Sequence, residues 1–158
     1  MSRAALESAI TPGQRILLDS SLLIAYLDGR EVASPVATVL IDDFVASGRN
    51  PAVISAVSVM EVVVRPLRHD AGAHHHVLNF INHTPHLEAI PIDVHVAQQA
   101  ASLRAVMRFK PADALVIACG MLAQVAYLVT NDDKWKQLQA FPNLPLSLCY
   151  LGDHRTTE

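Results

Sequence analysis

Five short apolar runs, separated by segments with a helical period, constrain the fold of this chain more than any other feature. Each run is shorter than a buried helix and rich in aliphatic residues, which is typical of strands covered on both faces of a parallel sheet. The runs lie at residues 15–19, 52–55, 87–92, 126–130 and 146–151. The alternation predicts a three-layer α/β/α fold around a mainly parallel sheet of about five strands.

The helical segments between the runs carry their own start and stop signals. Asp93 is placed to cap one helix, and Pro111 stands in the first turn of the next. Arg65 and Pro66 are expected to end the helix that begins at Ser58, because proline lacks the amide that an inner helical turn needs. The predicted helices span 20–27, 36–46, 58–64, 74–83, 93–107, 111–123 and 132–138.

The length of 158 residues suits a single domain. We expect this domain to span residues 15–151, between a weakly patterned leader at 1–14, which can form a short helix, and a tail at 152–158. No uncharged stretch approaches the ~20 residues of a membrane span, and the leader has no signal-peptide core. Cys119 and Cys149 are widely spaced and are expected to be buried, reduced thiols. These features favour a cytoplasmic protein that does not associate with membranes.

Four acidic residues stand where an α/β fold collects its ligands, near the carboxyl ends of the strands. Asp19 closes the first apolar run, and Asp132 lies two residues after the fourth. Glu61 lies among apolar residues in the helical segment after the second run. Asp113 lies in the first turn of the helix expected before the fourth run. Two strand ends and two helices can therefore bring four carboxylates to one crevice.

Each acid also has a purely structural interpretation. Asp19 and Asp132 can cap the helices that follow them, and Asp113 can favour a helix N-terminus through the helix dipole. Packed together, however, the four carboxylates would repel one another, and no matching set of Lys or Arg accompanies them in the sequence. Carboxylates with water suit Mg²⁺ or Mn²⁺, which remove the conflict. Such a metal can activate water and stabilise charge on a phosphodiester.

Charge and motif content narrow the alternatives. The net charge of −3 does not suggest a general nucleic-acid-binding surface, although it would become slightly positive if the four carboxylates held cations. The chain has no G-x-G-x-x-G and no Walker A motif, so dinucleotide and nucleoside triphosphate binding have little support. A haloacid dehalogenase phosphatase would need a second Asp where Ser21 stands. A response regulator would need an acidic pair near the first strand, which is not present.

The segments around the four acids follow a recognisable order. They read I-L-L-D-S-S-L-L-I-A-Y-L, S-V-M-E-V-V-V-R-P, K-P-A-D-A-L-V-I-A and A-Y-L-V-T-N-D-D-K-W. Together they resemble the acidic motifs of PIN domains, and the resemblance covers residues 15–151. It implies a Rossmann-like fold and a nuclease that depends on Mg²⁺ or Mn²⁺ and cleaves single strands. Among small bacterial members, the VapC-type toxins are mostly ribonucleases. The resemblance therefore also implies single-stranded RNA as substrate, a cognate antitoxin and a homodimer.

The resemblance assigns roles residue by residue. Four carboxylates are expected to bind the metal and to be catalytic: Asp19, Glu61, Asp113 and Asp132. Three neighbours are candidates for supporting them: Ser20, Thr130 and Asp133. Four basic residues near the motifs are candidates for RNA binding: Arg65, Arg108, Lys110 and Lys134. A catalytically silent PIN-like module that binds RNA or protein is the alternative, and the presence of all four acids favours the enzyme.

Two further patterns have simpler interpretations. His74, His75 and His76 are consecutive and would point about 100° apart on a helix, so they cannot converge on one metal and are expected to form a solvated face. A stripe of apolar residues follows the first acid and is expected to be core or a self-association face. It consists of Leu22, Leu23, Tyr26 and Leu27.

Overall fold

A five-stranded sheet lies at the centre of the computed structural model, which describes residues 3–69 and 72–154. The strands follow the order β3-β2-β1-β4-β5, and every neighbouring pair is parallel. They are β1 (Ile16–Leu18), β2 (Ala52–Ser55), β3 (Leu87–Ile90), β4 (Tyr127–Thr130) and β5 (Ser147–Tyr150). The predicted α/β class and its parallel sheet are confirmed, and each strand lies within its predicted apolar run.

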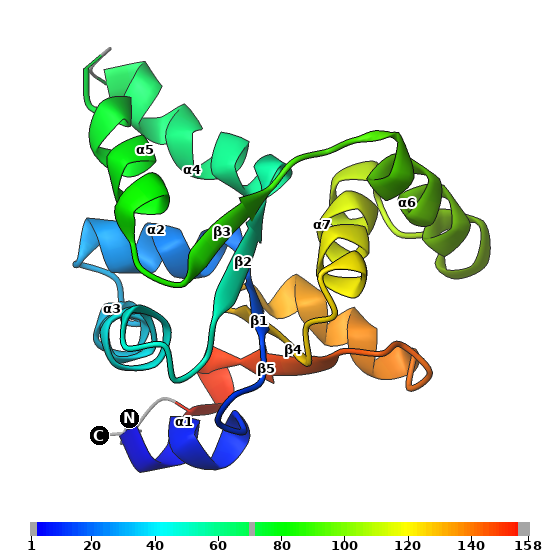
Figure 1. Ribbon diagram of the computed structural model, residues 1–158, viewed down its shortest axis with the longest axis horizontal. Helices are drawn as coiled ribbons and strands as arrows, with labels where there is room; N and C mark the ends of the chain where they lie inside the picture. The colour runs from blue at the N-terminus through cyan, green and yellow to red at the C-terminus, as the bar shows by residue number, and fades with distance from the viewer. Residues whose placement is uncertain (1–2, 70–71, 155–158) are drawn as a thin grey trace.

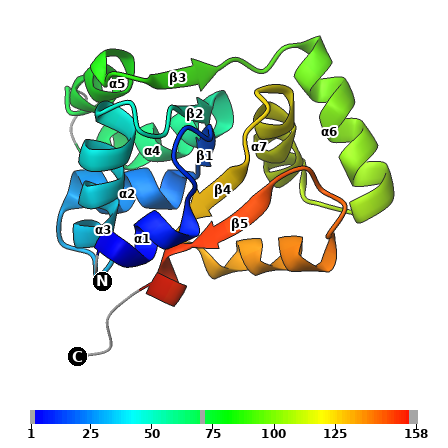
Figure 2. The ribbon, with the colours of Figure 1, turned by 60° about the horizontal axis from the view of Figure 1, so that its bottom comes forward.

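Helices cover both faces of the sheet, which makes three layers (Figures 1 and 2). One face is covered by α2 (Ser20–Asp28), α3 (Ser34–Thr38), the π-helix η1 (Val39–Ala46), α4 (Ala56–His69) and α5 (His74–His83). The other face is covered by α6 (Val94–Met107), α7 (Pro111–Leu122) and the 3₁₀ helix η2 (Asp133–Ala140). Asp93 caps α6 as expected, since its carboxylate accepts a hydrogen bond from the Val96 amide at 2.8 Å.

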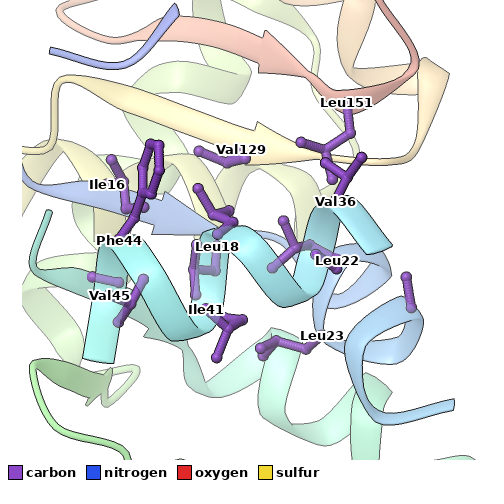
Figure 3. Close-up of a cluster of buried hydrophobic side chains, with 14 of the residues drawn as sticks. Ile16, Leu18, Leu22, Leu23, Val36, Ile41, Phe44, Val45, Val129 and Leu151 are labelled. Atoms are coloured by element: carbon purple, nitrogen blue, oxygen red, sulfur yellow. The ribbon is translucent and has the colours of Figure 1, made fainter. Parts of the chain in front are cut away.

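The strand residues alternate between two separate cores. Ile16 and Leu18 pack toward the face of α2, where Figure 3 shows them among Leu22, Phe44 and other side chains of that layer. Leu17 instead packs with the residues of α6, α7 and η2. This period of two is the geometry of an extended strand. Because the strand is buried on both faces, its sequence reads as a continuous apolar run.

The direction of winding reverses at β1. The connections from β1 to β2 and from β2 to β3 place their helices on one face, and the connections from β3 to β4 and from β4 to β5 use the other face. Right-handed crossovers require this change of face when the chain reverses its direction across the sheet. The carboxyl ends of β1 and β4 therefore flank the topological switch point, where parallel sheets open a ligand crevice.

Two predicted helices differ from the observed ones. The expected stop at Arg65 and Pro66 is wrong, because α4 continues through Pro66 to His69. Packing of α4 against α2 and α5 stabilises the helix and outweighs the loss of the backbone hydrogen bond that proline cannot donate. The helix expected over 36–46 is divided between α3 and the wider-wound η1, where Leu40, Ile41 and Phe44 remain buried.

The N-terminal leader is part of the packed structure. It forms α1 (Arg3–Ala9), and both Leu6 and Ile10 are fully buried in the core that they share with α2. Asn50 joins the turn after α1 to the sheet, because its side-chain amide donates to the carbonyls of Thr11 and Gln14, each at 2.8 Å. The tail begins within a short 3₁₀ helix, η3 (Leu151–His154), and residues 155–158 lie outside the described residues.

Several expectations from composition can be compared with the structure. Cys119 and Cys149 are buried free thiols, as predicted, and burial raises the pKa of Cys149 to about 11. Leu22 and Leu23 are fully buried, so this part of the apolar stripe is core. Among the described residues, no helix combines the length and the apolar character needed to cross a membrane.

Candidate active site

The four acids predicted from the sequence come from four elements that meet at the carboxyl edge of the sheet. Asp19 follows the last residue of β1, and Asp132 lies two residues after the end of β4. Glu61 stands on α4, and Asp113 lies in the first turn of α7. A helix that returns across a parallel sheet starts at the carboxyl edge. The first turns of α2, α4 and α7 therefore lie at the edge where β1, β2 and β4 end, and Glu61 follows in the second turn of α4.

Asp19 is the most enclosed of the four, with 2% of its surface exposed. Its Oδ2 accepts hydrogen bonds from the hydroxyls of Ser21 at 2.7 Å and Thr130 at 2.9 Å. The same oxygen accepts from the Ser21 amide at 3.4 Å and caps α2. The capping interpretation of Asp19 is therefore confirmed, and it is compatible with the predicted role of this residue in a site. A carboxylate with several donors has a fixed direction, which a ligand or base needs.

The two hydroxyls that hold Asp19 also fasten the ends of β1 and β4 to each other. Ser21 Oγ accepts a hydrogen bond from the Asn131 amide at 3.0 Å, and Thr130 Oγ1 accepts from the Asp132 amide at 3.0 Å. Thr130 is among the site residues predicted from the sequence, whereas Ser21 is not. The signal for Ser21 was its position two residues after Asp19, since a side chain there can return to the capping oxygen.

Glu61 reaches the same region from α4. Its Oε2 accepts a hydrogen bond from Ser20 Oγ at 2.5 Å. Ser20 is itself buried, with 8% of its surface exposed, and begins α2 directly after Asp19. This contact explains how a carboxylate tolerates the apolar surface of α4: it is partly buried and hydrogen-bonded to a neighbouring helix.

Lys134 lies among the acids, contrary to the expectation that they lacked a basic partner. Its Nζ is 3.2 Å from Asp132 Oδ2 and 3.6 Å from Asp113 Oδ1. Burial by itself lowers the pKa of the Lys134 ammonium, but the hydrogen bond to Asp132 and the charges of Asp19 and Asp113 raise it overall. The N-cap residue of η2 and a residue of α7 thus share one protonated amine.

The remaining candidates lie farther from this centre. Arg65 pairs with Asp28 at 3.3 Å, at the end of α2 opposite Asp19. Arg108 and Lys110 are exposed in the connection that leads into α7, close in sequence to Asp113. Asp133 is exposed as the first residue of η2, while Asp132 caps that helix by accepting from the Lys134 amide at 3.0 Å.

The carboxylates provide the donor chemistry of a divalent metal site without forming a closed cage. Among the described residues, no three His, Cys, Asp or Glu side chains are arranged so that they could hold a metal ion. Mg²⁺ typically takes one or two protein carboxylates and keeps several waters, so fewer ligands suffice. Asp113 and Asp132 already share a cation, the Lys134 ammonium, and their oxygens are the hard donors that Mg²⁺ and Mn²⁺ prefer. These two residues fit a metal best.

The hydroxyl of Thr130 provides a test of this arrangement. Replacing it with valine should lower the free energy of unfolding by about 1–3 kcal/mol, because the Asp132 amide and the buried Asp19 carboxylate both lose a partner. Thr130→Ser keeps the hydroxyl and should stay close to wild type. Urea unfolding in EDTA measures both variants. Equal stability of the valine and serine variants would contradict the role of the hydroxyl.

Solved structures of toxin–antitoxin proteins resemble this fold. A toxin–antitoxin complex from Klebsiella pneumoniae aligns with a TM-score of 0.63 and 20% identity, over 85% of this chain and 95% of that one. VapBC2 from Rickettsia felis, bound to a DNA fragment from its promoter, aligns with a TM-score of 0.62 and 17% identity, over 85% of this chain and 97% of that one. The sarcin–ricin loop cleaving toxin VapC20 from Mycobacterium tuberculosis aligns with a TM-score of 0.61 and 14% identity, over 77% of this chain and 92% of that one.

The sequence comparisons agree with the fold. No protein with a curated description matches this chain. The family model of the PIN domain matches residues 16–140, which include all four acids and most of the sheet. With the parallel sheet and the similar structures, this match shows that the chain belongs to the PIN domain family.

Proposed function

We propose that this chain is an endoribonuclease that hydrolyses phosphodiester bonds of single-stranded RNA with the aid of Mg²⁺ or Mn²⁺. The observation that supports the proposal is that Asp113 and Asp132 both contact the Lys134 ammonium, beside the Asp19 carboxylate that Thr130 holds at the end of β4. The proposal is further supported by VapC20, a protein of the same fold that cleaves the sarcin–ricin loop.

Each residue has a task that follows from its surroundings. Asp113 and Asp132 would hold the metal, since both present oxygens to one cation. Asp19 keeps a fixed direction through its hydroxyl donors and would orient water or complete the ligand set. Glu61, held by Ser20, would act as a further ligand or base. A bound divalent cation supplies activated water and charge stabilisation at the phosphate. The exposed Arg108 and Lys110 would contact the RNA backbone.

Variants of the acids test the mechanism. Asp19→Asn, Glu61→Gln, Asp113→Asn and Asp132→Asn should each reduce cleavage of a mixed single-stranded RNA pool by on the order of 10²–10⁴-fold, as expected for loss of a catalytic acid or base. EDTA should abolish cleavage by the wild type, and Mg²⁺ or Mn²⁺ should restore it. Gel analysis of the products measures these rates, and circular dichroism checks that each variant is folded.

Asp133→Asn is the matched control, because it removes an exposed carboxylate one residue beyond Asp132. It should cause a clearly smaller loss than Asp132→Asn. A larger loss in Asp133→Asn would show that Asp133, and not Asp132, is the fourth acid of the site. Metal-independent cleavage, or no cleavage of any RNA by the folded wild type, would contradict the proposed enzyme and favour the binding module.

We also propose that the chain is the toxin of a toxin–antitoxin pair. A cleft of about 340 Å³ between α2, α4 and α5 supports a protein partner, because Ile24, Leu27, Val62 and Val77 form much of its lining. Expression of the chain alone should arrest bacterial growth, and Asp19→Asn should remove the arrest. Unimpaired growth with soluble, RNA-cleaving protein in the cell would argue against a toxin.

A homodimer is the proposed assembly. On α4, Met60, Val64 and Leu67 form an exposed apolar stripe at helical spacing, with 58%, 37% and 50% of their surfaces exposed. Light scattering should give twice the chain mass of 17.1 kDa for the wild type. Replacing Met60 and Leu67 with glutamate should halve that mass, because a charged helix face cannot be buried at an interface. A monomeric wild type at micromolar concentration would reject the dimer.

A further inference from the structure

Lys134 makes an unusual set of contacts with a single carboxylate. Its backbone amide donates to Asp132 Oδ1 at 3.0 Å, while its ammonium lies 3.2 Å from Asp132 Oδ2. The same ammonium lies 3.6 Å from Asp113 Oδ1, on the first turn of α7. One lysine therefore holds both oxygens of Asp132 and connects η2 to α7 across the crevice.

No second basic group shares this task within the described residues. Among them, Lys134 is the only basic side chain that forms an ion pair with any of the four acids. Asp113 has 12% of its side chain exposed, and Asp132 has 33%, so their mutual repulsion is only partly screened by water. The ammonium is the charge that offsets it in the metal-free protein.

A divalent metal and the ammonium cannot both lie between these oxygens. Mg²⁺ requires oxygen ligands at about 2.0–2.1 Å in a near-octahedral arrangement, which leaves no room for a second cation between the same two carboxylates. The Lys134 side chain is 43% exposed and flexible, so it can turn toward solvent. A metal that binds between these two oxygens would therefore displace the ammonium.

We propose that Lys134 is a built-in counter-ion that neutralises the acidic crevice in the metal-free protein and competes with a divalent cation for Asp113 and Asp132. The competition rests on the metal site of the proposed function, whereas the counter-ion role does not. The proposal predicts opposite effects of removing the charge: a less stable metal-free protein and tighter metal binding.

Lys134→Met tests both effects, because methionine keeps much of the alkyl stem and removes the charge. Lys136→Met is the matched control: it removes the same charge from the same helix, but its Nζ lies 4.3 Å from the centre of the Tyr150 ring. In EDTA at low salt, Lys134→Met should lower Tm by about 2–4 °C relative to Lys136→Met. Adding Asp113→Asn to Lys134→Met should recover part of that loss, since one of the repelling charges is then absent.

Metal affinity is measured separately by electron paramagnetic resonance of Mn²⁺, without RNA. Lys134→Met should bind Mn²⁺ roughly tenfold more tightly than the wild type, whereas Lys136→Met should not change the affinity. If both variants match the wild type in Tm and in Mn²⁺ affinity, the proposal is overturned. If Mn²⁺ binds to both the wild type and Lys134→Met with the same affinity, the competition is overturned, but the proposed metal site stands.

Failure of the metal site itself gives a different result. If neither the wild type nor Lys134→Met binds Mn²⁺, the metal site of the proposed function is wrong, and the competition fails with it. The Tm comparison in EDTA then decides the counter-ion role alone. A drop confined to Lys134→Met supports it, and equal Tm values for the two lysine variants reject it.

Discussion

The hydrogen bonds to Asp19 Oδ2 are the interaction on which the site depends. They come from Ser21 at the start of α2 and from Thr130 at the end of β4, and they join two strands that are neighbours only because the sheet reverses its winding at β1. The same hydroxyls accept hydrogen bonds from the backbone amides of Asn131 and Asp132. Through them, the direction of Asp19 and the path of the chain after β4 are set together.

Secondary structure and chemistry share residues at this edge. Asp19 and Asp132 each accept the hydrogen bond of a helix cap, and Asp113 lies in a first turn, where the helix dipole favours negative charge. These structural roles place the carboxylates near a crevice without requiring further elements. The acids therefore contribute to local structure and at the same time form a cluster whose charge must be offset.

The Lys134 ammonium offsets part of the negative charge of these carboxylates. A cluster of carboxylates at low exposure is unfavourable unless a cation accompanies it. The ammonium fulfils this condition from within the chain, while the donor set also fits Mg²⁺ or Mn²⁺. If a metal binds as proposed, the balance between the ammonium and the metal would set how readily the metal enters.

The sequence alone determined the class of fold and singled out four acids as candidates for the site. Short aliphatic runs that alternate with helical segments are typical of strands with both faces covered. Asp19 and Asp132 lie just after two of these strands, and Glu61 and Asp113 lie on helices that start at the same edge of the sheet. Tertiary structure decided what local rules could not: α4 passes through Pro66 because neighbouring helices support it, and Ser21 and Lys134 acquire their roles from partners distant in the sequence. The physical reason is that a hydrophobic period or a helix cap depends on residues that are close together in the sequence. The partner of a hydroxyl or an ammonium, in contrast, is chosen by the packing of elements separated along the chain, such as η2 against α7.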